Sequence, residues 1–128
     1  MSILVLIACE KSNEPIVNDS DQLIGYWINP VIDDTTLTYE RANALTDNEY
    51  GFAFQSGNVF IERKNAGWCG TPPISYADFE GTWITTNSLI NITVRYWGGW
   101  ADYQWKIISA AKNKLTIYRL KEKYQRAE

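Results

Sequence analysis

The fold class of this chain is decided by the stretch Tyr50-Gly51-Phe52-Ala53-Phe54-Gln55-Ser56-Gly57-Asn58-Val59-Phe60-Ile61-Glu62-Arg63. Two runs of alternating character, 50–55 and 58–63, flank a Ser-Gly dipeptide. Side chains of a β-strand point alternately to opposite faces, so such runs are typical of strands with one buried face. A Ser-Gly pair between two strands is typical of a tight hairpin turn. The stretch therefore predicts an antiparallel β-hairpin.

The same alternation recurs along the chain, and no segment has a helical period. Further strands are predicted over 23–29, 36–41, 81–86, 89–96, 102–109 and 114–121. Antiparallel strands with one apolar face leave exposed edges unless the sheet closes on itself. We therefore predict an all-β fold, an eight-stranded antiparallel up-and-down barrel over residues 22–121, followed by a C-terminal tail over 122–128.

The alternation also predicts which side chains face the barrel interior. That inward set is Leu37, Tyr39, Phe52, Phe54, Val59, Ile61, Ile90, Ile92, Val94, Tyr96, Tyr103, Trp105, Ile107, Leu115 and Ile117. Barrels of this size are either filled by side chains or hold one small ligand. A void of a few hundred Å³ at one barrel end would favour the ligand. The candidate ligand-binding residues are the inward rings of Tyr39, Phe52, Phe54, Tyr96, Tyr103 and Trp105.

Two short motifs recur at a common offset and predict a two-fold internal pseudo-repeat. Gly25-Tyr26-Trp27 returns as Gly81-Thr82-Trp83, and Val59–Arg63 returns as Leu115–Arg119. Repetition at a fixed period is the sequence signature of duplicated structural units. On this hypothesis Trp83 lies beside Arg63, as Trp27 lies beside Arg119.

A second concentration of aromatic residues lies outside the predicted interior. Trp97 and Trp100 flank a Gly-Gly turn, and Trp68 lies in a long connection over 64–79. Exposed rings at a barrel rim suit a sugar or a partner protein, although aromatic pairs also stabilise hairpins. An interaction module that uses Trp68, Trp97 and Trp100, with a filled barrel, is therefore the alternative function. The 64–79 connection is apolar enough to pack over one barrel end, with Cys69 as a small buried hydrophobe.

The N-terminal residues resemble a targeting signal rather than part of the folded domain. An apolar run over 3–9 ends in Leu6-Ile7-Ala8-Cys9, which is typical of a bacterial lipobox. A polar stretch over 10–21 follows. We expect residues 1–8 to be a signal-peptide remnant and residues 9–21 to be a lipidated Cys9 with its polar tether. The membrane partner is then reached through the acyl chains on Cys9, in the bacterial cell envelope and at its outer membrane. The alternative for this run is a buried first strand that ends in a cysteine.

The amino-acid composition excludes several classes of catalytic and metal-binding site. The chain has 128 residues with 12 Lys and Arg, 15 Asp and Glu, no His, six Trp, eight Tyr and four Phe. Without His it lacks Ser-His-Asp and Cys-His nucleophiles and His-ligated zinc. A net charge of −3 argues against a nucleic-acid partner. No carboxylates have the spacing of a calcium loop. We expect no enzyme activity, no metal and no cofactor.

The chain resembles the lipocalins at Gly25-Tyr26-Trp27, near the start of the predicted barrel. It is more closely similar to the small lipocalin-like lipoproteins of Bacteroidota, through Leu23–Trp27, Tyr50–Phe54, Ile61–Asn65, Gly67–Pro73 and Glu80–Trp83. The resemblance implies a barrel closed at one end, with an arginine late in the barrel packed across the tryptophan; Arg119 over Trp27 matches that position. It further implies a monomer that binds a small apolar or amphiphilic ligand in the barrel.

Overall fold

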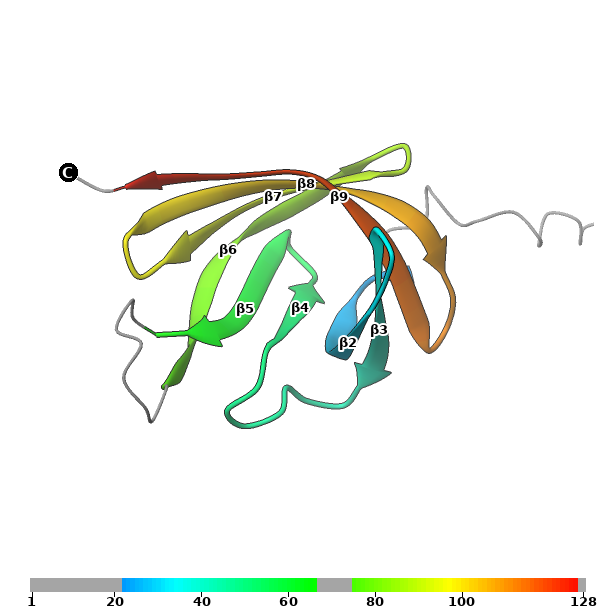
Figure 1. Ribbon diagram of the computed structural model, residues 1–128, viewed down its shortest axis with the longest axis horizontal. Helices are drawn as coiled ribbons and strands as arrows, with labels where there is room; N and C mark the ends of the chain where they lie inside the picture. Colours follow the sequence, from blue (N-terminus) through cyan, green and yellow to red (C-terminus); the bar gives the residue numbers. More distant parts are fainter. Residues whose placement is uncertain (1–21, 67–74, 127–128) are drawn as a thin grey trace, which may run out of the picture.

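The computed structural model describes residues 22–66 and 75–126, and the folded part consists of strands (Figure 1). The eight strands are β2 (Gly25–Asp33), β3 (Thr36–Ala42), β4 (Gly51–Gln55), β5 (Val59–Asn65), β6 (Tyr76–Thr86), β7 (Leu89–Tyr96), β8 (Gly99–Ala110) and β9 (Lys114–Arg126). Each corresponds to a predicted strand. Among the described residues, no helix is long and apolar enough to cross a membrane. The predicted signal-peptide remnant, Cys9 and the polar tether lie outside the described residues.

The eight strands form one closed antiparallel barrel, which confirms the predicted fold class. From β4 to β9 each strand pairs with the next in sequence, as in an up-and-down barrel. The first hairpin departs from this order, because β2 pairs with β4 while β3 pairs with β9. Residues 43–50 therefore pass from one side of β2 to the other. Leu45 in this connection lies over Gly51, where an added Cβ would approach its side chain closely.

Two predicted boundaries are wrong. β6 begins at Tyr76, so the connection predicted over 64–79 is shorter, and its Trp68 and Cys69 lie outside the described residues. β9 continues to Arg126, which pairs with Gly99 of β8, so most of the predicted C-terminal tail is strand. Residues 122–126 escaped prediction because most of their side chains are exposed, so no apolar alternation marks them.

The predicted inward faces are correct on most strands and wrong on β5. Phe60 and Glu62 are buried, whereas Val59 and Ile61, expected inside, are only half-buried. Three consecutive apolar residues, 59–61, allow either phase of the alternation, and the tertiary fold selects the phase that buries the larger phenyl ring. Tyr96, also expected inside, is half-buried and packs against the edge of the core.

The internal pseudo-repeat is wrong at its second motif. Trp27 and Trp83 are both buried, as the repeat requires. On β9, however, Leu115 and Ile117 are buried, whereas their counterparts on β5 lie on the outer face. The sequence match over Val59–Arg63 and Leu115–Arg119 therefore joins segments of opposite phase, and it does not reflect a structural duplication.

The two glycines of the Gly-x-Trp motifs are required for different reasons. Gly25 has a φ of +143°, and a Cβ there would overlap the Arg41 guanidinium. At Gly81 a Cβ would overlap the backbone carbonyl of Thr93, because β7 approaches closely at that point.

Arg41 closes one end of the barrel. Its guanidinium carbon lies 4.4 Å from the centroid of the Trp27 ring, in cation-π geometry. The same group donates hydrogen bonds to the backbone carbonyls of Gln22, Ile24 and Lys112. Three segments that are distant in sequence are therefore joined by one side chain.

The expected contact of Arg119 with Trp27 is wrong, and strand direction is the reason. β9 starts beside the closed end, where Lys114 pairs with Glu40 of β3. By Arg119 the strand has run several residues toward the opposite end of the barrel. There Arg119 approaches Glu122 rather than an indole face. Arg63, expected beside Trp83, forms an ion pair with Asp78 instead, 2.7 Å between Nε and Oδ1.

We predict that Arg41→Met lowers the free energy of unfolding by about 2 to 3 kcal/mol, because it removes a cation-π contact and three charged hydrogen bonds to backbone carbonyls. Arg119→Met is the matched control and should cost less than about 1 kcal/mol, since its ion pair is partly exposed. Urea denaturation of both variants measures the difference. Equal losses, or a greater loss for Arg119→Met, would contradict the role assigned to Arg41.

Candidate functional site

The closed half of the barrel is filled with aromatic rings. Phe52 stands at their centre, with its ring centroid 4.7 Å from that of Tyr39, 5.2 Å from that of Trp105 and 5.3 Å from that of Phe54. All four side chains are almost completely buried. Tilted and edge-to-face pairs of this kind stabilise a core beyond the area they bury. These rings fill much of the interior of this half of the barrel.

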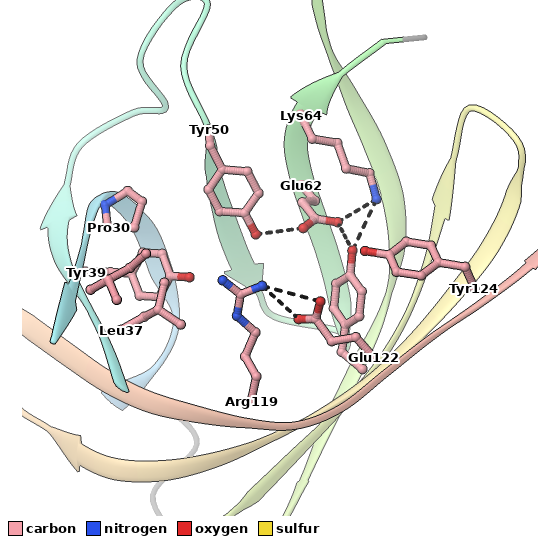
Figure 2. Close-up of a pocket in the computed structure, with 11 residues that line it drawn as sticks. Pro30, Leu37, Tyr39, Tyr50, Glu62, Lys64, Arg119, Glu122 and Tyr124 are labelled. Carbon is pink, nitrogen blue, oxygen red and sulfur yellow. Dashed lines mark hydrogen bonds and ion pairs between the residues drawn. The ribbon is translucent and has the colours of Figure 1, made fainter. Parts of the chain in front are cut away.

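The other half contains a cavity of about 410 Å³ (Figure 2). It extends from buried residues to the surface, because Tyr39 in its wall is 1% exposed while Ile32 is 71% exposed. A volume of this size lies within the range of small-molecule pockets. The lining residues are Pro30, Ile32, Leu37, Tyr39, Tyr50, Glu62, Lys64, Tyr103, Arg119, Glu122 and Tyr124.

Glu62 lies in the wall of this cavity and is only 2% exposed. Its Oε1 accepts hydrogen bonds from Lys64 Nζ at 2.7 Å and from the Tyr103 hydroxyl at 2.8 Å. Its Oε2 accepts one from the Tyr50 hydroxyl at 2.7 Å. A buried carboxylate is costly unless it is paired and hydrogen-bonded, and both conditions are met here. We call these four residues the Glu62 network.

A second charged pair, from β9, faces the Glu62 network across the cavity (Figure 2). Arg119 Nη1 lies 3.4 Å from Glu122 Oε1, and the two side chains are 43% and 20% exposed. Trp105 Nε1 donates to Glu122 Oε2 at 3.0 Å. Glu122 therefore has a second donor and does not depend on Arg119 alone.

Burial shifts the titration of the phenols that line the cavity. Loss of solvation raises the pKa of Tyr39, Tyr50, Tyr103 and Tyr124 above the ordinary value for tyrosine, and the charge of Glu62 acts in the same direction. The effect on Arg119 has two parts. Burial is the largest single effect and lowers its pKa. The charge and hydrogen bond of Glu122, together with the phenols of Tyr39 and Tyr50, outweigh burial, so the pKa is raised. All four phenols are therefore neutral hydrogen-bonding groups over the physiological pH range.

The structure divides the predicted ligand-binding residues between two locations. Tyr39 and Tyr103 line the cavity. Phe52, Phe54 and Trp105 pack the closed half beneath it. Tyr96 contacts the rings of Trp97 and Tyr124, with centroid distances of 5.6 and 5.1 Å.

Sequence reasoning missed the polar residues of the cavity. Tyr50, Glu62, Lys64 and Glu122 had no predicted role there, and Arg119 was assigned to the closed end. The reversed phase of β5 explains Glu62, because the same error placed it on the solvent face. The signal that could have identified it is its spacing of two from Phe60, which puts both side chains on one face.

Trp97 and Trp100 are exposed, as predicted, by 41% and 43%. Each ring already has a cationic partner. The guanidinium carbon of Arg126 lies 5.8 Å from the centroid of Trp97, and that of Arg95 lies 5.0 Å from the centroid of Trp100. These contacts are typical of rings that stabilise a hairpin surface.

Within residues 22–66 and 75–126, no group of three or more Cys, Asp and Glu side chains is placed to hold a metal ion. No protein-family model, curated protein or solved structure matches the chain.

We predict that the free energy of unfolding falls as the pH rises above about 10, the ordinary pKa of tyrosine. Unfolded phenols lose their protons there, while the folded protein keeps those of the cavity, so the unfolded state gains stability. Tyr39→Phe should reduce this loss between pH 9 and 11 by about 1 kcal/mol, because it removes one such phenol. Urea denaturation at the two pH values measures it.

The control for this prediction is Tyr118→Phe, which removes a phenol from the exposed outer face of β9. It should leave the loss close to that of the wild type. Identical losses for the wild type and Tyr39→Phe would show that the Tyr39 phenol is not shielded in the folded state.

Proposed function

We propose that this protein is a lipocalin-like barrel that binds one small amphiphilic molecule in the cavity beside the Glu62 network. The observation that carries the proposal is the cavity of about 410 Å³, which reaches from the buried interior to the surface at one barrel end. A closed eight-stranded antiparallel barrel with an arginine packed over the Gly-x-Trp tryptophan supports the lipocalin-like assignment. In this chain that arginine is Arg41, from an early strand.

The lining of the cavity favours an amphiphile over a wholly apolar ligand. Its wall presents the charged Glu62 and Lys64, which are largely buried, and Arg119, whose side chain is 43% exposed. Its outer part presents Pro30 and Ile32, whose side chains are exposed beside the tip of the β2–β3 hairpin. A wholly apolar ligand would desolvate the inner charges without replacing their water contacts. A molecule with a polar head and an apolar tail satisfies both regions.

The alternative proposal, an interaction module based on Trp97 and Trp100, has less support. Arginines already cover part of both rings, and a partner would have to displace or share those contacts. The cavity, by contrast, offers a ligand about 410 Å³ beside charged and hydrogen-bonding side chains.

We also propose that the barrel is anchored to the bacterial outer membrane through lipid chains on Cys9, and that it acts as a monomer. The motif Leu6-Ile7-Ala8-Cys9 and the polar residues that follow it support the anchor. Several acyl chains on one residue bind a membrane almost permanently, because each buried CH₂ contributes about 0.8 kcal/mol. Ligand exchange would then take place near a lipid surface.

We predict that Ile32→Ser weakens binding of decanol about three- to tenfold in calorimetric titration, because an apolar tail loses its contact at the cavity mouth. Val31→Ser is the matched control. Val31 is 60% exposed on the adjacent position of the same strand, but it does not line the cavity, so affinity should remain at the wild-type value. Equal losses for both variants, or binding in neither the wild type nor the control, would contradict a ligand in this cavity.

We predict that the full-length native gene yields protein in the detergent phase, and that Cys9→Ser shifts it to the aqueous phase or leaves it unprocessed. Detergent partitioning of extracts from the source organism measures this. Wild-type protein in the aqueous phase would refute the lipid anchor, and it would leave the ligand-binding proposal intact.

A further inference from the structure

The hydroxyl of Tyr39 is buried in the cavity wall without a partner. Tyr39 is 1% exposed, and its hydroxyl has no hydrogen-bond partner among the described residues. A buried hydroxyl without a partner is destabilising, and native proteins rarely contain one. Figure 2 shows it directed toward the guanidinium of Arg119. A guanidinium only donates hydrogen bonds, so Arg119 cannot accept one from the Tyr39 hydroxyl. The O–H proton of Tyr39 therefore still needs an acceptor.

Arg119 also has unused hydrogen-bonding capacity. Its bonds to Glu122 are both made by Nη1, at 3.4 and 3.5 Å, which is long for a charged pair. Nε and Nη2 have no hydrogen-bond partner in the part of the chain that the structure describes. The guanidinium can therefore donate to a further group while Nη1 keeps Glu122.

Both carboxylates of the cavity already accept hydrogen bonds from protein donors. Glu62 accepts three hydrogen bonds, from Lys64, Tyr103 and Tyr50. Glu122 accepts from Trp105 as well as from Arg119. Lys64, the other cation, is held 2.7 Å from Glu62 Oε1. The hydrogen-bonding capacity left at Arg119 consists of donors, so a ligand that pairs with Arg119 must bring acceptors.

An apolar path leads outward from these donors. Leu37 and Ile32 are opposite each other in the β2–β3 pairing, and both line the cavity. Leu37 is 7% exposed and Ile32 is 71% exposed, so the path runs from the interior to solvent. An extended hydrocarbon chain is the ligand part that such a path suits.

We propose that the ligand is an amphiphilic carboxylic acid, bound head-first, whose carboxylate accepts hydrogen bonds from the Arg119 guanidinium and the Tyr39 hydroxyl. Its chain leaves the barrel along Leu37 and Ile32. This inference rests on the proposed ligand-binding function and specifies the head group and its orientation. It supplies the partner that the buried Tyr39 hydroxyl lacks, and it turns the weak Arg119–Glu122 pair into a three-membered network.

The test compares three probes that share a ten-carbon chain: decanoate, decanol and decyltrimethylammonium. Each is titrated below its micellar concentration into the full chain at pH 8, and the affinity is measured by calorimetry. We expect decanoate to bind at least about tenfold more tightly than decanol, since charge-assisted hydrogen bonds are the stronger kind. The cationic probe should bind least tightly, because its head accepts no hydrogen bond from Arg119 and is repelled by the guanidinium charge.

Two variants locate the head group. Arg119→Met should abolish the preference for decanoate over decanol while decanol still binds, which also shows that the variant is folded. Tyr39→Phe should weaken decanoate several-fold with no loss of Tm in the free protein, because its hydroxyl has no partner there. Arg95→Met, which removes an arginine from the Trp100 surface, is the control and should change neither affinity.

The outcomes separate the two proposals. Decanoate and decanol binding equally, with no effect of Arg119→Met or Tyr39→Phe, would overturn the carboxylate head and leave amphiphile binding standing. Tightest binding of the ammonium probe would overturn it in the same way. Failure of all three probes to bind would overturn amphiphile binding itself. If Arg119→Met does not fold, an unchanged decanoate affinity in Tyr39→Phe overturns the inference independently.

Discussion

The buried carboxylate of Glu62 is the constraint around which the open half of this barrel is organised. A charge that is 2% exposed must be neutralised and hydrogen-bonded, and Lys64, Tyr50 and Tyr103 do both. These side chains take positions that apolar residues would otherwise fill, and they leave a polar wall beside an unfilled volume. The polar wall of the cavity follows from this charge, and the charge adds to the effect of burial in raising the pKa values of the surrounding phenols.

The closed half is built on the opposite principle. Its interior is aromatic, with Phe52 in contact with rings from β3, β4, β5 and β8. Its end is sealed by Arg41, which covers Trp27 and binds carbonyls from distant segments. A rigid, filled end gives the strands around the cavity a fixed position, and preorganisation of this kind lowers the entropic cost of binding a ligand. On the proposed function, one half of the barrel supplies stability and the other half binds the ligand.

The sequence predicted the strands and the closed barrel because period-two alternation survives over at least part of most strands. It could not fix the phase of β5, where Val59, Phe60 and Ile61 are all apolar, and that one ambiguity concealed Glu62. It also could not assign Arg41 and Arg119 to barrel ends, although both follow the alternation inward from Tyr39 and Ile117. Their ends depend on strand direction and on the exchanged order of the first hairpin, which are properties of the tertiary fold.

A double-mutant cycle on Glu62→Gln and Lys64→Met, measured by urea denaturation, tests most directly whether the buried carboxylate organises this half of the barrel. Each single substitution leaves one charge without its partner, whereas the double substitution removes both. The account predicts that the double variant loses less stability than the sum of the single variants, by at least about 1 to 2 kcal/mol. Additive losses, with no coupling between Glu62 and Lys64, would contradict it.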